Sequence, residues 1–442
     1  MEIISRKEIT KMRSTKELIL YKNFENGKLF YNFTWLMENL LNEYYNKDDM
    51  AALYYECYHD LMELSVSHGF EGNLWHNFLT FLMVNNENAY SMACEIRGKV
   101  EGSINDIAVH DFAVIKEFFD FDLHKLEEAF SVSGVDVLLH YEGVDKGSKV
   151  FNKRIRDRIC ELCVLLSKAE TIEEFKDDVT QFYKEFGVGK LGLHKAFRIE
   201  DELKGAKIIP ITNIAHVHLD DIVGYDIAKE KLTENTRAFV EGRKANNCLL
   251  FGDAGTGKSS SIKAIVNQYY EQGLRMIEIY KHQFQGLNDV IAQIKNRNYK
   301  FIIYMDDLSF EEFEIEYKYL KAVIEGGLEK KPENVLIYAT SNRRHLVREN
   351  FSDKAQLEDD LHNNDTVQEK LSLVARFGVQ IYFGSPDKKD FQNIVLELAR
   401  RNGIEMERDA LLLEANKWEL SHGGRSGRTA QQFVDYLLGK SH

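Results

Sequence analysis

The stretch Phe251-Gly-Asp-Ala-Gly-Thr-Gly-Lys-Ser259 decides the fold of the second half of this chain. An apolar run at 248–251 precedes it and predicts a buried strand, and an amphipathic run after it predicts a helix. Glycines at these positions let the backbone take positive φ angles and turn its N–H groups toward an anion. A glycine loop that ends in Gly-Lys-Ser between a strand and a helix is typical of a phosphate-binding loop.

The residue types in this loop fit the chemistry of a nucleotide. Lys258 is placed to reach the β- and γ-phosphates, and the Ser259 hydroxyl is placed to bind Mg²⁺. The positive end of the following helix adds to the same site. The predicted phosphate-binding set is Gly252, Asp253, Ala254, Gly255, Thr256, Gly257, Lys258, Ser259 and Ser260.

Two acids follow a second apolar run, Phe301-Ile-Ile-Tyr-Met305, which predicts another strand. In an open α/β sheet, ligands lie at the carboxyl ends of the strands. Asp306 is therefore predicted to hold Mg²⁺, through water, and Asp307 to orient the attacking water. Asp307 is also a candidate helix N-cap, because Asp307-Leu-Ser-Phe-Glu-Glu could open a helix. The phosphate-binding loop favours the magnesium and water interpretation.

Composition narrows the class of protein. The 442 residues allow two or three domains, and 44% hydrophobic and 29% charged residues are ordinary for a soluble globular protein. No run approaches the roughly 20 apolar residues of a membrane span, and the first residues lack the apolar core of a signal peptide. The net charge of −14 argues against a generic nucleic-acid binder, although it does not exclude a local basic groove. Five cysteines, an odd and sparse set, argue against a disulfide framework and fit the cytoplasm, where we expect the protein.

Cys160 and Cys163 form a CxxC motif on what looks like an apolar helical face. Because no second CxxC or His pair lies at zinc spacing, core packing is the favoured interpretation. Metal or redox work is the alternative.

The first 209 residues contain no proline, which suits long helices. Apolar residues at helical spacing predict one helix around 36–45 and another around 53–62. This region is also dense in Phe and Tyr. We interpret that density as core packing, with an aromatic partner-binding surface as the alternative.

After Pro210 the pattern changes to short apolar strands that alternate with helices. The candidate strands are 248–251, 276–280, 301–306, 335–340 and 379–383, and the chain from Ser385 onward has a helical pattern. The predicted fold class is α/β, with a helical N-terminal domain at 1–205, a parallel-sheet nucleotide-binding domain at 206–384 and a small helical lid at 385–442.

Taken in order from about Asp220 to the end, these motifs resemble the AAA+ ATPase superfamily, and within it a little-studied bacterial family of predicted ATPases with a helical N-terminal region. Residues 220–226 resemble the segment that packs on adenine, 252–259 resemble Walker A, and 305–307 resemble Walker B. Residues 338–342 resemble the sensor 1 strand, 375–378 the position of an arginine finger, and 426–430 the start of the sensor 2 helix.

The resemblance implies roles for further residues. Asn342 would lie near the γ-phosphate, and Arg376 would reach a γ-phosphate in a neighbouring subunit, an intramolecular salt bridge being the alternative. Arg428, which directly follows a glycine, is favoured over Arg425 as the lid sensor. The implied adenine-side residues are Ile222, Val223, Gly224 and Tyr225, and the Arg343-Arg344 pair could face a neighbour or solvent.

One position departs from the superfamily pattern. Most of its Walker B motifs end in Asp-Glu, whereas the second acid here is Asp307, which is one methylene shorter. Misplacement by about 1 Å can cost on the order of a hundredfold in rate, so slow turnover is an open outcome. Three nearby acids could substitute for it: Glu311, Glu312 and Glu314.

The resemblance thus implies an ATPase that binds ATP with Mg²⁺ and hydrolyses it to remodel a protein or nucleic-acid partner. It also implies a homo-oligomeric ring, often of six subunits in this superfamily, with the N-terminal domain as the recogniser of the partner. The alternative is a slowly hydrolysing switch or loader that binds its partner in the ATP state.

Overall fold

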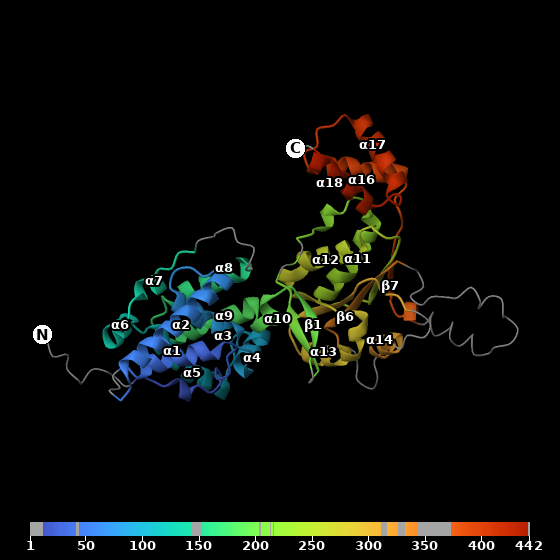
Figure 1. Ribbon diagram of the computed structural model, residues 1–442. Helices are drawn as coiled ribbons and strands as arrows, with labels where there is room; N and C mark the ends of the chain where they lie inside the picture. The colour runs from blue at the N-terminus through green and yellow to red at the C-terminus, as the bar shows by residue number, and fades with distance from the viewer. Residues whose placement is uncertain are drawn as a thin grey trace. The chain divides into compact units, whose positions relative to one another are not determined.

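The computed structural model describes residues 12–40, 44–143, 153–202, 205–212, 214, 216–310, 316–325, 332–342 and 373–440. The chain divides into two compact units, Met1–His194 and Lys195–His442, and each has its own core. In Figure 1 the first unit is coloured from blue to green and the second from green to red.

The first unit is built of helices. Side-chain caps begin several of them, as where the Asn46 side chain accepts from the Asp48 N–H and Thr171 from the Glu174 N–H. The helices are α1 (Gly27–Glu38), α2 (Lys47–His68), α3 (Leu74–Asn85), α4 (Ala89–Arg97), α5 (Ser103–Phe119), α6 (His124–Phe130), α7 (Val135–Leu139), α8 (Lys153–Leu166), α9 (Ile172–Phe186) and α10 (Gly189–Leu193). The predicted helical N-terminal region is confirmed.

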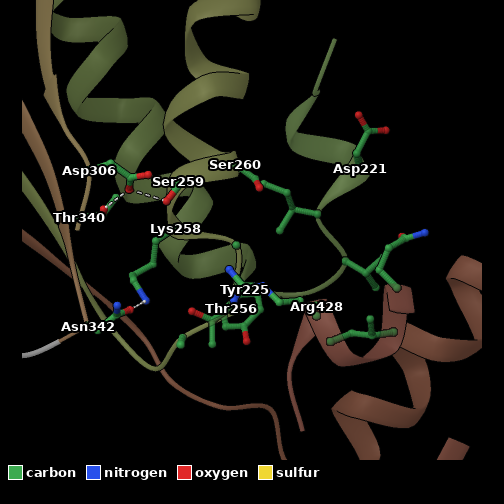
Figure 2. Close-up of a pocket in the computed structure, with 18 of the residues that line it drawn as sticks. Asp221, Tyr225, Thr256, Lys258, Ser259, Ser260, Asp306, Thr340, Asn342 and Arg428 are labelled. Carbon is green, nitrogen blue, oxygen red and sulfur yellow. Dashed lines mark hydrogen bonds between the residues drawn. The ribbon is translucent and has the colours of Figure 1, made fainter. Parts of the chain in front are cut away.

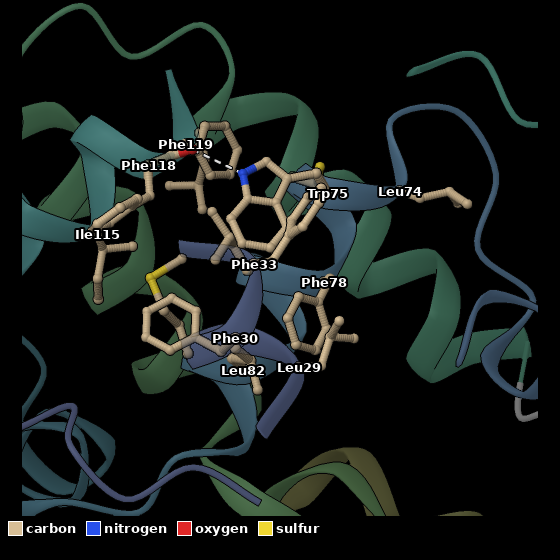
Figure 3. Packing of buried hydrophobic residues seen from close by; sticks show 14 of the residues in the cluster. Leu29, Phe30, Phe33, Leu74, Trp75, Phe78, Leu82, Ile115, Phe118 and Phe119 are labelled. Atoms are coloured by element: carbon tan, nitrogen blue, oxygen red, sulfur yellow. Dashed lines mark hydrogen bonds between the residues drawn. The ribbon is translucent and has the colours of Figure 1, made fainter. Parts of the chain in front are cut away.

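Aromatic side chains form the centre of this unit's core. Trp75 is fully buried and packs edge-on against Phe33, with ring centroids 4.9 Å apart (Figure 3). Its indole N–H donates to the backbone oxygen of Phe118 over 2.8 Å, so the polar edge of the ring is satisfied inside the core. Most of the aromatic density therefore has a packing role.

Of the helix predicted around 36–45, the described residues show only the start. α1 ends at Glu38, and Tyr44, with 98% of its surface exposed, is not helical; residues 41–43 lie outside the described residues. Asn39 follows the last residue of α1, and Asn46 is the N-cap of α2. The second predicted stripe lies in α2, where its central residues Tyr54, Cys57 and Leu61 are buried.

Cys160 and Cys163 lie one turn apart on α8 and pack against the core of the first unit. Burial raises the pKa of Cys160 to about 11 and that of Cys163 to about 12, so both thiols stay protonated at neutral pH. Within the described ranges, no three His, Cys, Asp or Glu side chains gather to hold a metal ion. The burial favours core packing for this motif.

The second unit is built on a single sheet, which has seven strands in the described part of the chain. They are β1 (Ala196–Glu202), β2 (Gly205–Pro210), β3 (Cys248–Gly252), β4 (Leu274–Glu278), β5 (Lys300–Met305), β6 (Val335–Ser341) and β7 (Val379–Phe383). Their order is β2-β1-β4-β5-β6-β3-β7, and all neighbours are parallel except β1 and β2. The predicted parallel-sheet α/β fold is confirmed, and β6 lies between β3 and β5.

Two of these strands do not appear among the predicted ones. β1 and β2 form an antiparallel hairpin, and β1 also pairs with β4. Their sequences alternate apolar and charged residues or end in Pro210, unlike the apolar runs of the inner strands. The expected domain boundary after residue 205 falls at the turn of this hairpin, whereas the division between the two units falls after His194.

Helices cover the sheet and form a separate C-terminal layer (Figure 1). Those of the sheet region are α11 (Asp226–Val240), α12 (Lys258–Tyr269), α13 (Leu287–Ile294) and α14 (Glu316–Glu325). The C-terminal helices are α16 (Lys388–Arg401), α17 (Arg408–Ser421) and α18 (Gly427–Lys440), and they share a small core around Phe391 and Phe433. None of the described helices combines the length and the apolar character that crossing a membrane requires.

A buried carboxylate anchors the start of the first unit. Asp111 on α5 has no exposed surface, and its oxygens accept from the backbone N–H groups of Ile19, Leu20 and Tyr21 at 2.7–3.1 Å. One side chain thereby satisfies three consecutive backbone donors.

We expect Asp111→Ala to destabilise this segment by about 2–3 kcal/mol, because it removes charge-assisted hydrogen bonds to three backbone N–H groups, of which that of Tyr21 is buried. Amide hydrogen exchange of residues 19–21 in the full-length chain measures the effect. Asp106→Ala, at an exposed position of the same helix, is the control and should leave these amides protected. Equal exchange in both variants would contradict the anchoring role.

Candidate functional site

The loop between β3 and α12 has the backbone that its glycines predict. Gly252, Gly255 and Gly257 take φ angles of 133°, 75° and 93°. A Cβ atom on Gly252 would lie 2.1 Å from the backbone oxygen of Phe383, so only glycine fits there. α12 then begins at Lys258 with no described side chain capping its N-terminus. Its free N–H groups are available to an anion.

Lys258 points into the same place. Its buried ammonium donates to the backbone oxygens of Gly252 (2.9 Å) and Asp253 (2.5 Å) and to Oδ1 of Asn342 (3.0 Å; Figure 2). Burial lowers the pKa of Lys258, while the charges of Asp253 and Asp307 act in the opposite direction. The three N–H donors of the Lys258 ammonium are thus paired with uncharged carbonyl and amide oxygens. Charged phosphate oxygens could take the place of these acceptors.

Asp306 and Ser259 meet at the end of β5. The Ser259 hydroxyl donates to Oδ1 of Asp306 over 2.7 Å, and the Thr340 hydroxyl donates to the same oxygen over 2.6 Å (Figure 2). Burial alone would raise the pKa of Asp306, but hydrogen bonds, led by that of Thr340, outweigh it and leave the pKa lowered. The site therefore offers an ionised carboxylate beside a hydroxyl, the oxygen ligands that Mg²⁺ prefers, with room for water and phosphate to complete the shell.

Strand register explains this meeting. Leu250 on β3 pairs with Thr340 on β6, and Met305 on β5 pairs with Ala339. One residue further, Asp306 comes level with Thr340: Asp306 directly follows β5 and Thr340 is the second-last residue of β6, and the carboxyl ends of these strands share one edge of the sheet. The hydroxyl at Thr340, which the sequence analysis did not select, is thus placed between the loop and the acid.

Asp307 takes a left-handed backbone conformation with φ of 49°. Its N–H donates to the Thr340 hydroxyl over 2.9 Å, and its Oδ1 accepts from the Asn342 side chain over 2.7 Å. Residues 308–310 are not helical, and the next described helix begins at Glu316, so the N-cap alternative does not fit these residues.

The predicted substitutes Glu311, Glu312 and Glu314, like the Arg343-Arg344 pair, lie outside the described residues.

These groups line one pocket of about 520 Å³, a volume typical of small-ligand sites. Most of the predicted site residues lie in it: Ile222, Val223, Tyr225, Ala254, Gly255, Thr256, Gly257, Lys258, Ser259, Ser260, Asp306, Asp307, Asn342 and Arg428. Gly224, Gly252, Asp253 and Arg376 do not line it. The Asp253 carboxylate instead accepts from the Ser385 N–H over 2.7 Å, where the chain leaves β7 for the C-terminal helices.

One wall of the pocket is largely apolar. It combines the predicted Ile222 and Val223 with Ile394 and Leu398 of α16, which the sequence analysis missed. Tyr225 stacks on Phe383, with ring centroids 5.2 Å apart, and donates to the backbone oxygen of Gly384 over 3.0 Å. Such a wall suits a planar apolar group beside the polar phosphate end of the pocket.

The three arginines considered as lid sensor or arginine finger differ in their position relative to the pocket. Arg428 lines the pocket, and its backbone N–H donates to the Gly255 oxygen over 3.1 Å, whereas Arg425 lies 3.6 Å from Glu419. Arg376 precedes β7, at the opposite end of that strand from the loop. Five strand residues span roughly 16 Å, so Arg376 is remote from its own pocket.

Other lining residues escaped the sequence analysis: Asp221, Thr340, Ile394, Leu398, Gly427 and Gln431. Asp221, Thr340 and Gly427 each lie within two residues of a predicted one, which is the signal that could have found them. The pair from α16 could not have been chosen, because apolar residues of a helix give no sign of which ones face a ligand.

A parallel-sheet domain with a phosphate-binding loop, an acid at a neighbouring strand end and a helical C-terminal layer defines the class as a P-loop nucleotide-binding fold. Residues 192–441 match the family described as "Protein of unknown function (DUF815)", and the chain belongs to that family. The match covers the segment whose motifs resemble AAA+ ATPases, and the expected membership of a little-studied family is confirmed.

Solved structures give a weaker likeness. One is the RuvB Holliday junction branch migration motor of Thermotoga maritima, with 16% identity, a TM-score of 0.34 and coverage of 50% of this chain and 64% of that chain. A mutant of the same protein gives 16% identity, a TM-score of 0.36, and coverage of 50% and 65%. The chain thus spans less than two thirds of these structures. No curated protein matches it.

We expect Thr340→Val to expose the Asp307 amide, because valine has the shape of threonine but offers no acceptor for that N–H. Hydrogen exchange of the peptide covering 301–308 should accelerate by about tenfold at this amide. Thr340→Ser keeps the hydroxyl and should retain most of the protection. Equal protection in all three proteins would contradict the bridging role of Thr340.

Proposed function

We propose that this protein is an ATPase that binds ATP with Mg²⁺ and hydrolyses the bond between the β- and γ-phosphates. The observation that supports it best is the convergence of Lys258, the Ser259–Asp306 pair and the Asp307–Asn342 pair on one pocket. Phosphoryl transfer to water needs little covalent chemistry from a protein beyond such positioning and charge stabilisation.

Each residue has a place in the proposed reaction. Lys258 exchanges its backbone oxygens for phosphate oxygens, and the N–H groups of 254–260 surround them. Ser259 and Asp306 hold Mg²⁺, which when bound neutralises charge on the phosphates. Asn342 and Asp307, joined by a hydrogen bond, orient the attacking water, and the Asp307 carboxylate accepts its proton. Arg428 contacts the phosphates from the side of the C-terminal helices.

The adenine end of the ligand is assigned to the apolar wall around Ile222, Val223 and Tyr225. We assign the C-terminal helices as a lid, because Arg428 and Leu398 reach the pocket from that layer. Movement of the lid with the nucleotide state would drive remodelling of a protein or nucleic-acid partner. The helical first unit is the proposed recogniser of that partner.

A slowly hydrolysing switch or loader is the second candidate, and the short side chain of Asp307 favours it. Steady-state turnover with and without single-stranded DNA or an unfolded protein separates the two. Stimulated, rapid turnover supports remodelling, and slow turnover with capture of a partner in the ATP state supports the switch.

We expect Asp307→Asn to bind ATP as the unchanged protein does but to release phosphate on the order of a hundredfold more slowly, because the amide cannot accept a proton. Asparagine also tolerates the left-handed backbone of this position. Calorimetry and a phosphate-release assay measure the two steps. Lys258→Ala is the matched comparison and should lose ATP binding itself. Unaltered phosphate release by Asp307→Asn would move the proton-accepting role to another acid.

Arg376 is proposed to complete the site of a neighbouring copy in a ring, since it is remote from its own pocket. We therefore expect that mixing Arg376→Ala protein with Lys258→Ala protein restores part of the turnover that each lacks alone. Subunit exchange is verified first with fluorescently labelled chains. Exchange without any recovery of turnover would count against a role across subunits.

A further inference from the structure

Tyr304 carries a buried hydroxyl that the proposed reaction does not use. It lies on β5 two residues before Asp306, and its side chain has 1% of its surface exposed. The hydroxyl has no hydrogen-bond partner among the residues that the structure describes. Buried hydroxyl groups are normally paired, so this one calls for a physical explanation.

Tyr304 belongs to the strand that leads into the Ser259–Asp306–Thr340 cluster. Successive strand residues alternate between the two faces, so Tyr304 and Asp306 lie on the same face of β5. The phenol and the carboxylate therefore extend from the same side of the chain, although no described residue makes a hydrogen bond to the phenol.

The carboxylate has room for a further donor. Ser259 and Thr340 both donate to Oδ1 of Asp306, whereas an ionised carboxylate has about four acceptor positions on its two oxygens. Phenylalanine at position 304 would fill the same apolar space between β5 and α12, so packing alone does not require the hydroxyl.

We propose that Tyr304 is a positioning residue of the magnesium site, whose hydroxyl donates to Asp306 when the metal is bound. This inference rests on the proposed function, because it assumes that Asp306 and Ser259 hold Mg²⁺. The phenol would act as a third donor beside Ser259 and Thr340 and fix the carboxylate against the pull of the metal and its water. Partners of this kind tune metal affinity without contacting the metal.

The neighbouring strand provides a matched control. Tyr338 on β6 pairs in register with Tyr304, is also fully buried, and lies on the same face of the sheet. Its hydroxyl, unlike that of Tyr304, is hydrogen-bonded, at 2.9 Å to Thr236 and at 3.0 Å to Asn235 of α11. Removing either hydroxyl deletes one oxygen atom from the same layer of the core.

The test is Mn²⁺ binding to the full-length chain, followed by electron paramagnetic resonance in the presence of a nonhydrolysable ATP analogue. We expect Tyr304→Phe to weaken Mn²⁺ binding by about tenfold and to leave metal-free nucleotide affinity unchanged. Tyr338→Phe should change neither quantity, even where it lowers stability.

Four results would overturn the proposal or part of what it rests on. Equal Mn²⁺ affinity in Tyr304→Phe and the unchanged protein overturns the role of Tyr304 alone. Equal weakening by Tyr304→Phe and Tyr338→Phe assigns the effect to packing and overturns it as well. An unchanged protein that binds the analogue but takes up no Mn²⁺ removes the magnesium site, and one that binds no analogue removes the proposed function itself.

Discussion

The hydrogen bond from Ser259 to Asp306 joins the first turn of α12 to the end of β5, and the arrangement of the pocket depends on it. β5 and β3, the strand that leads into α12, are not adjacent in the sheet, because β6 lies between them. Thr340, at the end of β6, donates to the same carboxylate oxygen and so bridges the gap. Two hydroxyl donors offset the burial of Asp306 and keep it ionised before any ligand arrives. A site that is organised in advance loses less free energy to reorganisation when charge develops in it.

The loop is also the point at which the C-terminal helices are attached to the sheet. The Asp253 N–H donates to the Phe383 oxygen, and the Asp253 carboxylate holds the Ser385 N–H, at the exit toward α16. At the start of α18, the Arg428 N–H donates to Gly255. The helical layer is therefore bound at two points, before α16 and at the start of α18, to backbone that surrounds the phosphate position. If a bound phosphate changes the conformation of the loop, these hydrogen bonds transmit the change directly to the C-terminal helices. No long chain of intervening contacts is required.

The sequence predicted strands β3 to β7, the loop and the two acids because each carries a strong local signal: an apolar run, a glycine spacing, or charge at a strand end. It did not predict β1, whose alternating residues serve a hairpin and whose pairing with β4 is not local. Nor did it select Thr340, because its importance comes from the register of β6 between two other strands. Leu398 is a similar case, since an apolar face shows that a helix packs but not which residues border a cavity. In each of these cases, the feature that could not be predicted depends on contacts between segments that are distant in the sequence.

The aspartate at position 307, which departs from the superfamily pattern, has a local structural context. The chain turns sharply after β5, and Asp307 takes a left-handed backbone conformation that aspartate and asparagine tolerate better than most side chains. A longer acid would enter this turn at a greater steric cost. The turn is held by Thr340, which accepts from the Asp307 N–H, while Asn342 donates to the carboxylate over 2.7 Å. The reach of the acid is thus set by the backbone turn and by its partner on the next strand as much as by side-chain length. The missing methylene alone therefore does not decide how fast this site can work, and the position of Asn342 becomes as important as the identity of the acid.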